Sequence, residues 1–253
     1  LLAPFFALTF ETEEHNVKFS KIWILIALLV PINAFAANPF FPNWSLFEHQ
    51  PNIRQGGRTN SVAVNPADAN QMLAASDSGG LFESIDGGLR WSHVDKLPVI
   101  FTQSIAYLPN DVVLVSAKAD FKTTNGGGVW RRDISGDWAQ VTLTVPFPSA
   151  PLSAYEISAV DENVVVGTSE GVFVSTNSGL SWTWSDPFGG GDRRVFSVLL
   201  TSGASPRILA GGPGGVRLGT IAPGPWVPSN SSIGGIWSIH AFGRSPLSTS
   251  QAF

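Results

Sequence analysis

The chain has 253 residues, a formal net charge of −4 and 13% charged residues, about half the fraction usual in globular proteins. Its 26 glycines and 18 prolines argue against a helical protein, and its 43% hydrophobic residues argue against disorder. The negative balance excludes a basic field for nucleic acid. The absence of cysteine excludes disulfides, cysteine-ligated zinc, iron–sulfur clusters and thiol catalysis.

Residues 17–36 have the pattern of a secretory signal peptide. A basic start at residues 18–21 precedes an apolar run over 22–30, and residues 34–36 form a small-residue A-x-A cleavage site. The apolar run is far shorter than the roughly 20 residues that a transmembrane helix needs. We therefore predict a signal-peptide helix that is removed after Ala36, and an exported bacterial protein (periplasmic, cell-surface or extracellular) without a transmembrane anchor.

Residues 1–16 precede this signal and contain three glutamates, which a signal peptide rarely carries. The chain begins with leucine, and its single methionine is Met72. We interpret residues 1–16 as an upstream extension of the reading frame, with Val17 as the candidate start. Residues 37–253 then form the mature protein.

Residues 37–253 repeat a pattern of short strands. Each unit opens with an alternating strand and continues with a second apolar run, a third strand, a turn and a fourth strand. The opening strands align on Val62, Ile105, Ile157, Phe196 and Trp237, which are spaced by 43, 52, 39 and 41 residues. Four strands in about 40–45 residues are typical of a β-propeller blade. We predict an all-β β-propeller of about four four-stranded blades and the start of a fifth, which indicates a fragment.

A short motif recurs at the expected turn between the third and fourth strands. Ser or Thr, Asp or Asn, and Gly stand seven, five and three positions before a Trp. The three copies are Ser84, Asp86, Gly88 and Trp91; Thr123, Asn125, Gly127 and Trp130; and Ser175, Asn177, Gly179 and Trp182. An Asp or Asn side chain can close a turn, and Gly accepts a positive φ. Because two copies replace Asp86 by Asn, the motif indicates a structural rather than a catalytic carboxylate.

These segments resemble the Asp box, or bacterial neuraminidase repeat, whose pattern is S-x-D-x-G-x-x-W. The repeat occurs in sialidases, two-propeller xyloglucanases, sortilin-type receptor domains and propellers like the photosystem II assembly factor. The resemblance covers roughly residues 54–240 and implies a β-propeller, but enzymes and binding proteins share it. It also implies that the motif turns lie on the lower rim. Ligands would then meet the upper face, where the second strand turns into the third and the fourth leads to the next blade.

Charged residues in the loops of that upper face are the candidate site residues. They are Asp77, Lys118, Asp120, Glu170, Asp192, Arg193 and Arg194. Asp77 resembles the catalytic aspartate of the xyloglucanases and is the candidate catalytic residue; the alternative is a loop residue that supports the turn. A glycosidase needs a second carboxylate, and Asp120 or Glu170 are the available partners in this chain.

Other site types find little support. A sialidase needs a tyrosine nucleophile, three arginines and an Arg-Ile-Pro element, and the region 52–58 contains no proline. The histidines lack metal-ligand spacing, and the glycines at 211–215 are not followed by a phosphate-loop pattern. Trp138, Trp184 and Trp226 pack between blades or stack on sugars; both readings stay open.

The sequence thus predicts an exported Asp-box β-propeller that acts as a binding or assembly module for a protein or glycan at its upper face. No cofactor and no metal are expected. The alternative is a glycoside hydrolase of the xyloglucanase or sialidase-like type, with Asp77 as one carboxylate.

Overall fold

The computed structural model describes residues 57–120, 126–229 and 239–242. The signal peptide at 17–36, the extension at 1–16 and the motif residues Thr123 and Asn125 lie outside the described residues. No helix long and apolar enough to cross a membrane occurs in the described part.

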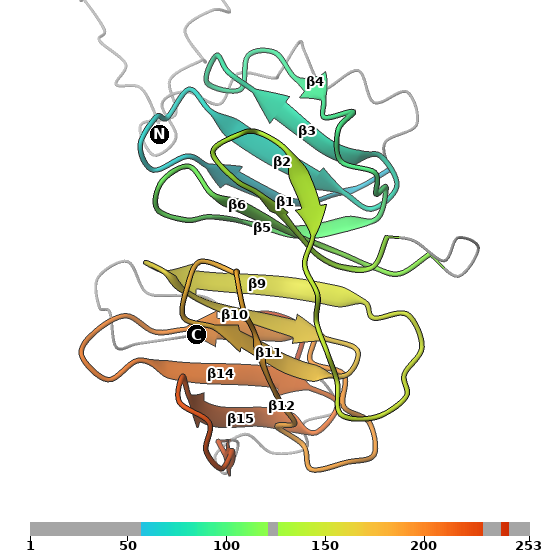
Figure 1. Ribbon diagram of the computed structural model, residues 1–253, viewed down its shortest axis with the longest axis vertical. Helices are drawn as coiled ribbons and strands as arrows, with labels where there is room; N and C mark the ends of the chain where they lie inside the picture. Colours follow the sequence, from blue (N-terminus) through green and yellow to red (C-terminus); the bar gives the residue numbers. More distant parts are fainter. Residues whose placement is uncertain (1–56, 121–125, 230–238, 243–253) are drawn as a thin grey trace, which may run out of the picture. The chain divides into compact units, whose positions relative to one another are not determined.

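Sixteen strands form four four-stranded antiparallel sheets in the described part, here called the first to fourth blades (Figure 1). The first blade contains β1 (Thr59–Val64), β2 (Met72–Ser76), β3 (Gly80–Ser84) and β4 (Ser92–His93). The second contains β5 (Thr102–Tyr107), β6 (Val113–Ala117), β7 (Gly128–Arg132) and β8 (Trp138–Gln140). The third contains β9 (Ala154–Val160), β10 (Asn163–Thr168), β11 (Gly171–Ser175) and β12 (Thr183–Ser185). The fourth contains β13 (Ser197–Leu200), β14 (Arg207–Gly212), β15 (Gly215–Thr220) and β16 (Val227–Pro228).

Each blade is a meander whose strands pair in chain order, so the predicted all-β fold of four-stranded blades is confirmed. The strand pairings also align the blades residue by residue. Val62 pairs with Ala74, Ile105 with Val115, Ile157 with Val166, and Val198 with Ala210. The first three alignment anchors are therefore correct. The fourth is Val198 rather than Phe196, because β13 begins only at Ser197.

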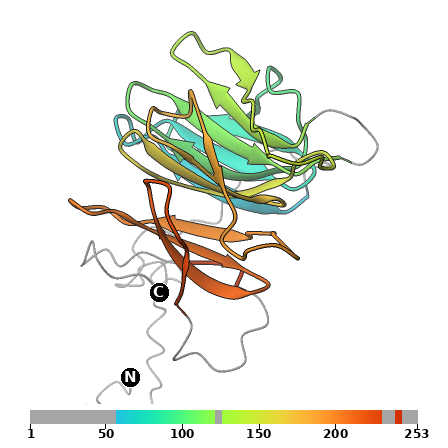
Figure 2. The same cartoon turned by 60° about the horizontal axis from the view of Figure 1, so that its bottom comes forward.

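The blades follow one another in chain order (Figure 2). Buried apolar side chains fill the space between neighbouring blades. Successive residues of a strand point to opposite faces of its sheet. In β6, Val113 and Val115 join the cluster with the first blade, whereas Leu114 joins the cluster with the third. Both faces of β6 are thus covered, which explains its uninterrupted apolar sequence.

The first strand of each blade lies beside the first strand of the next, in the order β1, β5, β9 and β13. Polar side chains connect these strands. The Ser104 hydroxyl accepts the Ile157 N–H at 3.2 Å, and the Ser158 hydroxyl accepts the Leu200 N–H at 2.9 Å. These bonds satisfy N–H groups at strand edges that would otherwise be free. They also fix how β5, β9 and β13 stand next to one another.

Candidate functional site

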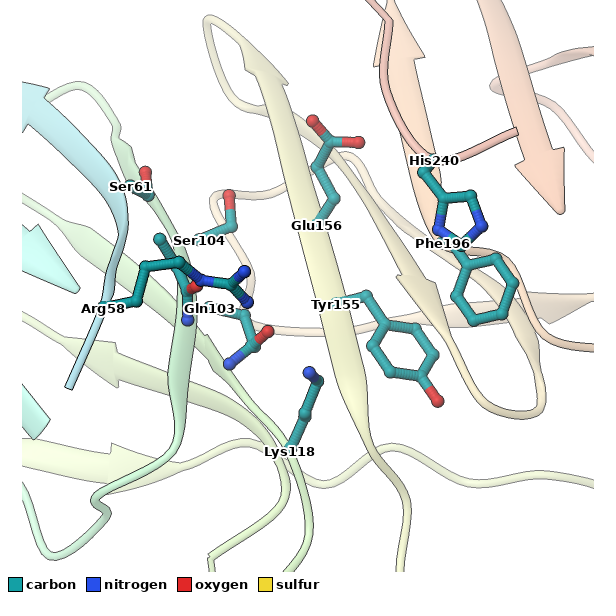
Figure 3. A pocket seen from close by; sticks show the side chains of 10 residues that line it. Arg58, Ser61, Gln103, Ser104, Lys118, Tyr155, Glu156, Phe196 and His240 are labelled. Carbon is teal, nitrogen blue, oxygen red and sulfur yellow. The ribbon is translucent and has the colours of Figure 1, made fainter. Parts of the chain in front are cut away.

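The starts of β1, β5 and β9 and the approach to β13 surround a cavity of about 490 Å³, here called the mouth (Figure 3). Because neighbouring strands are antiparallel, this end of the blades also carries the loops between second and third strands. It is the rim on which the sequence predicts ligand binding. The mouth is lined by Arg58, Asn60, Ser61, Gln103, Ser104, Lys118, Tyr155, Glu156, Phe196 and His240.

Two rows of equivalent positions supply most of this lining. The strand pairings place Asn60, Gln103, Tyr155 and Phe196 in one row, and Ser61, Ser104, Glu156 and Ser197 in the next. Three blades have serine in the second row, and the third blade has Glu156 instead. The repeat therefore provides one frame, and the side chains placed on it differ from blade to blade.

The two amides of the first row are held by one backbone carbonyl. Asn60 Nδ2 donates to Thr102 O at 2.9 Å, and Gln103 Nε2 donates to the same oxygen at 3.0 Å. A carbonyl only accepts, so the nitrogen of each amide must face it and the amide oxygen is left as an acceptor. Neither amide oxygen accepts a hydrogen bond from another described residue.

Glu156 is anchored by one of its two carboxylate oxygens. Oε2 accepts the Ser197 hydroxyl and, at 2.9 Å, the Val198 N–H, both from the fourth blade. Burial raises the pKa of Glu156, and these two hydrogen bonds offset only part of the shift. Oε1 accepts no hydrogen bond within the described part of the chain, and the side chain lines the mouth.

Two cations reach the mouth from neighbouring blades. The Arg58 side chain is 77% exposed, and its Nε lies 3.8 Å from Asp77 Oδ2. Lys118 follows β6 and forms no ion pair with any described residue. Figure 3 shows the polar ends of Arg58, Gln103 and Lys118 extending into the same space.

Aromatic rings form the side of the mouth towards the fourth blade. The Tyr155 ring lies 5.4 Å from that of Phe196, which stacks on His240 at 4.6 Å. The Arg194 guanidinium lies 5.4 Å from the centre of the Phe196 ring. Burial raises the pKa of Tyr155, so its hydroxyl keeps its proton at neutral pH and can donate.

Most of the loop residues singled out in the sequence lie beside the mouth rather than in its lining. Asp77 Oδ1 accepts the Arg58 N–H at 2.8 Å and so holds the start of β1. Asp120 lines a smaller neighbouring cavity of about 170 Å³ together with Lys118. Glu170 accepts the Trp184 indole N–H at 2.6 Å through its backbone oxygen.

The loop before β13 is organised by a residue that the sequence analysis did not single out. The Asp186 carboxylate accepts the N–H groups of Phe188, Gly189 and Gly190 at 2.9–3.0 Å. It also accepts Arg193 Nε at 3.0 Å. The glycine-rich segment 186–194 is therefore built around a carboxylate.

Arg193 and Arg194 have separate partners. Arg194 pairs with Asp192 through two of its nitrogens, and this pairing lowers the pKa of Asp192. The Arg193 guanidinium lies 4.4 Å from the centre of the Phe147 ring. No group of three or more metal-ligating side chains occurs among the residues that the structure describes.

The opposite ends of the blades carry the motif turns. The Ser84 hydroxyl donates to Asp86 Oδ1 at 2.9 Å and accepts the Gly88 N–H at 2.9 Å. Asp86 Oδ1 also accepts the Arg90 N–H at 2.8 Å, and Trp91 Nε1 donates to Gly88 O at 3.0 Å. These bonds give the turn a fixed shape without any contact to the mouth.

The third copy repeats these bonds with an amide. The Ser175 hydroxyl donates to Asn177 Oδ1 at 3.0 Å and accepts the Gly179 N–H at 3.0 Å. Asn177 Oδ1 accepts the Ser181 N–H at 2.9 Å, and Trp182 Nε1 donates to Gly179 O at 3.0 Å. An amide oxygen thus occupies the place of the Asp86 carboxylate oxygen.

The alignment of the second copy is wrong. Trp130 lies inside β7 and pairs with Val115, as Phe82 pairs with Ala74 in the first blade. Gly127 precedes β7 and is not in a turn between third and fourth strands; a Cβ there would lie 2.1 Å from Leu152 O. The Thr-Asn-Gly-Trp spacing of the second copy therefore falls on the loop between β6 and β7 and the start of β7, not on a turn between third and fourth strands.

The actual turn of the second blade spans residues 133–137 and leads into Trp138. Asp133 Oδ1 accepts the Ser135 N–H at 2.9 Å, and Gly136 has a φ of 82°. A carboxylate and a positive-φ glycine recur, but Arg132 stands where the other two turns have serine. This turn therefore departs from the S-x-D-x-G-x-x-W pattern.

Trp138, Trp184 and Trp226 lie in two kinds of surroundings. Trp138 and Trp226 pack against the clusters between blades. The Trp184 ring contacts Phe147 edge-on at 5.6 Å, near the loop before β13. The two readings offered by the sequence thus separate: the first two pack between blades, and only Trp184 belongs to the upper rim.

Neither a protein-family model nor a curated protein matches the chain. Among solved structures it is similar to an ancestral GH74 enzyme, with 19% identity and a TM-score of 0.55 over 71% of this chain and 26% of that one. It is similar to YCF48 bound to D1 peptide, with 16% identity and a TM-score of 0.51 over 76% of this chain and 58% of that one. It is also similar to the extracellular domain of a putative one-component system from B. thetaiotaomicron, with 17% identity, a TM-score of 0.56, and coverage of 76% and 25%.

The chain spans less than two thirds of each of these proteins, between 25% and 58% of their length. At such low identities the likeness shows the fold alone. Together with the four antiparallel meanders, it establishes that the described part of this chain consists of consecutive blades of a β-propeller.

Proposed function

We propose that the protein is an exported Asp-box β-propeller that acts as a binding or assembly module and holds a protein or glycan partner at the mouth. The observation that carries this proposal is the set of held but incompletely bonded groups around one cavity. Asn60 Oδ1, Gln103 Oε1 and Glu156 Oε1 accept no hydrogen bond from a described residue, although another atom of each side chain is held by hydrogen bonds. Lys118 adds a cation without an ion-pair partner in the described chain.

The mouth has the size and composition of a ligand site. A volume of about 490 Å³ lies within the range of about 300–1,000 Å³ that small-ligand pockets occupy. The similar structures include one protein bound to a peptide and one extracellular domain. Binding of a partner and an extracellular location are both part of the function proposed here. The signal-peptide pattern at residues 17–36 supports export.

A capture experiment tests the proposal. Full-length wild-type chain and two mouth variants, Gln103→Leu and Lys118→Met, are immobilised and exposed to cell-envelope extract. Any partner that the wild type retains should be lost from both variants. Lys96→Met is the matched control, because Lys96 pairs with Asp137 and does not line the mouth. A partner retained equally by all four proteins contradicts the proposed site.

The alternative function, a glycoside hydrolase, depends on Asp77. Its carboxylate lies in the β2–β3 loop, is 35% exposed, and already accepts the Arg58 N–H. If this function holds, the chain should release reducing sugar from xyloglucan, and Asp77→Asn should abolish the release because an amide cannot transfer the proton. Binding without release of sugar supports the binding module instead.

A further inference from the structure

We propose that the mouth binds an acidic saccharide, a sugar unit that carries a carboxylate beside its hydroxyl groups. This inference rests on the proposed function, since it names the ligand of the same site. It follows from three properties of the lining: the kind of hydrogen-bonding atoms left unused, the charge, and the ring that forms one wall.

Three of the unused polar atoms of the lining are acceptors, and they stand on three different strands. Asn60 Oδ1 lies on β1, Gln103 Oε1 on β5 and Glu156 Oε1 on β9, and each group is held in place through its other atom. Acceptors that converge on one cavity require a compact ligand with donors in several directions. A sugar ring offers such donors as hydroxyl groups. An extended peptide directs its backbone N–H groups to one side only at every second residue, about 7 Å apart.

The charge of the lining favours an anionic group on that ligand. Lys118 has no ion-pair partner among the described residues. Arg58 pairs with Asp77 only through its Nε, at 3.8 Å, and its guanidinium donates no hydrogen bond to another described residue. A carboxylate placed between these two cations would form charge-assisted hydrogen bonds, which are stronger than neutral ones. A neutral sugar would leave this potential unused.

The Tyr155 ring supplies an apolar wall next to these polar groups. It is half-buried and packs at 5.4 Å on Phe196, which His240 and Arg194 hold in turn. Its orientation is therefore fixed before any ligand arrives. The C–H face of a sugar ring can lie on such a ring while its hydroxyls reach the amides. Figure 3 shows the Tyr155 ring beside Lys118, with its hydroxyl pointing away from Lys118 and Gln103.

Titration calorimetry of the full-length chain tests the inference with three soluble ligands: trigalacturonate, its methyl ester and hexaglutamate. Trigalacturonate should bind, and the neutral ester should bind about tenfold more weakly because it lacks the charge. Lys118→Met should weaken trigalacturonate about tenfold and leave the ester unchanged. Gln103→Leu should weaken both sugars. Lys96→Met is the matched lysine control, since Lys96 pairs with Asp137 outside the mouth, and should change neither.

Each other outcome identifies what fails. Equal binding of trigalacturonate and its ester overturns the acidic preference. Binding of hexaglutamate alone, lost in Lys118→Met, overturns the saccharide while the mouth remains a binding site for acidic peptide. If no ligand binds, the inference fails; if envelope capture is also insensitive to Gln103→Leu and Lys118→Met, the proposed function fails with it. The unfolding midpoint of each variant shows whether a loss of binding reflects a loss of fold.

Discussion

The two ends of the blades are built in opposite ways. At the lower ends of the first and third blades, Ser84 and Ser175 make the same hydrogen bonds to the same neighbouring positions. At the upper ends, equivalent positions hold four different residues: Asn60, Gln103, Tyr155 and Phe196. A feature that repeats in several blades meets a need of the blade itself. A feature that changes from blade to blade on the same frame serves something that the blades make together, here the mouth.

If this comparison is right, a change in a lower turn should reduce stability and leave binding intact. The largest effect is expected for Gly179→Val. Gly179 has a φ of 79°, and a Cβ there would lie 3.1 Å from Leu114 Cδ2 and 3.3 Å from the Trp182 ring. Backbone strain and overpacking together should cost about 2–5 kcal/mol of unfolding free energy, measured by denaturant titration.

Gly189→Val separates these two causes. Gly189 has a similar φ of 74°, but no atom lies within 4 Å of the position of a Cβ. Strain alone should cost about 1–2 kcal/mol there. Equal losses at the two glycines would mean that the lower turn does not pack tightly against the second blade.

A smaller effect is expected for Ser84→Ala. The Ser84 hydroxyl is buried and accepts the Gly88 N–H, so its removal leaves that N–H without a partner. The expected loss is about 1–2 kcal/mol, again by denaturant titration. Ser135→Ala in the second blade is the control, because Ser135 only donates to a turn that Asp133 already closes through a backbone N–H. An unchanged unfolding free energy in Ser84→Ala would show that the turn does not need the serine.

The difference between the two ends also explains what the sequence predicts well. The number of blades and the order of their strands follow from the alternating strands and apolar runs in the sequence. Both faces of the second strand of a blade are buried, so this strand is apolar throughout; in β6, Val113 and Leu114 lie on opposite faces and both are buried. The second motif copy fails for a related reason. The matched spacing runs through the β6–β7 loop, so it predicts that Trp130 follows the turn, whereas Trp130 lies in β7.

The mouth is harder to predict because its residues share no pattern. Charged loop residues such as Asp77 and Glu170 are easily selected from the sequence as candidate site residues. Asn60, Gln103 and Glu156 lie within strands, and their sequence context does not distinguish them from polar residues at any exposed strand edge. These residues stand out only when the first strands of the blades are aligned by their pairing partners. In that alignment Glu156 occupies the position that is serine in the other blades. The bond from Asn60 to Thr102 O joins the first and second blades, and sequence spacing does not reveal it.

A mouth residue should affect stability mainly through its charge, as Glu156→Gln tests. The raised pKa means that the folded protein disfavours the carboxylate form. At pH 7 the glutamine variant should be slightly more stable than the wild type, since an amide oxygen can still accept from Ser197 and Val198. As the pH falls through the folded pKa towards the ordinary value of glutamate, the wild type gains a proton and the difference should vanish. Thermal unfolding at pH 7 and pH 4 measures it, and a variant that is less stable at pH 7 contradicts the assignment.

The smallest effect on stability is expected for Asp86→Asn, and the prediction is that the unfolding midpoint at pH 7 hardly changes. Asn177 already makes the corresponding bonds in the third blade, with its Oδ1 accepting the Ser181 N–H at 2.9 Å. At pH 7 the variant should therefore unfold at nearly the wild-type denaturant midpoint. The Arg90 N–H and the Ser84 hydroxyl lower the pKa of Asp86, so the charged form favours folding above the ordinary pKa of aspartate, about 4. This contribution should be lost as the pH falls through the folded pKa, and the variant should lack that part of the pH dependence. A large loss of stability at pH 7, or a loss of ligand binding at the mouth, would give Asp86 a role that a turn residue does not have.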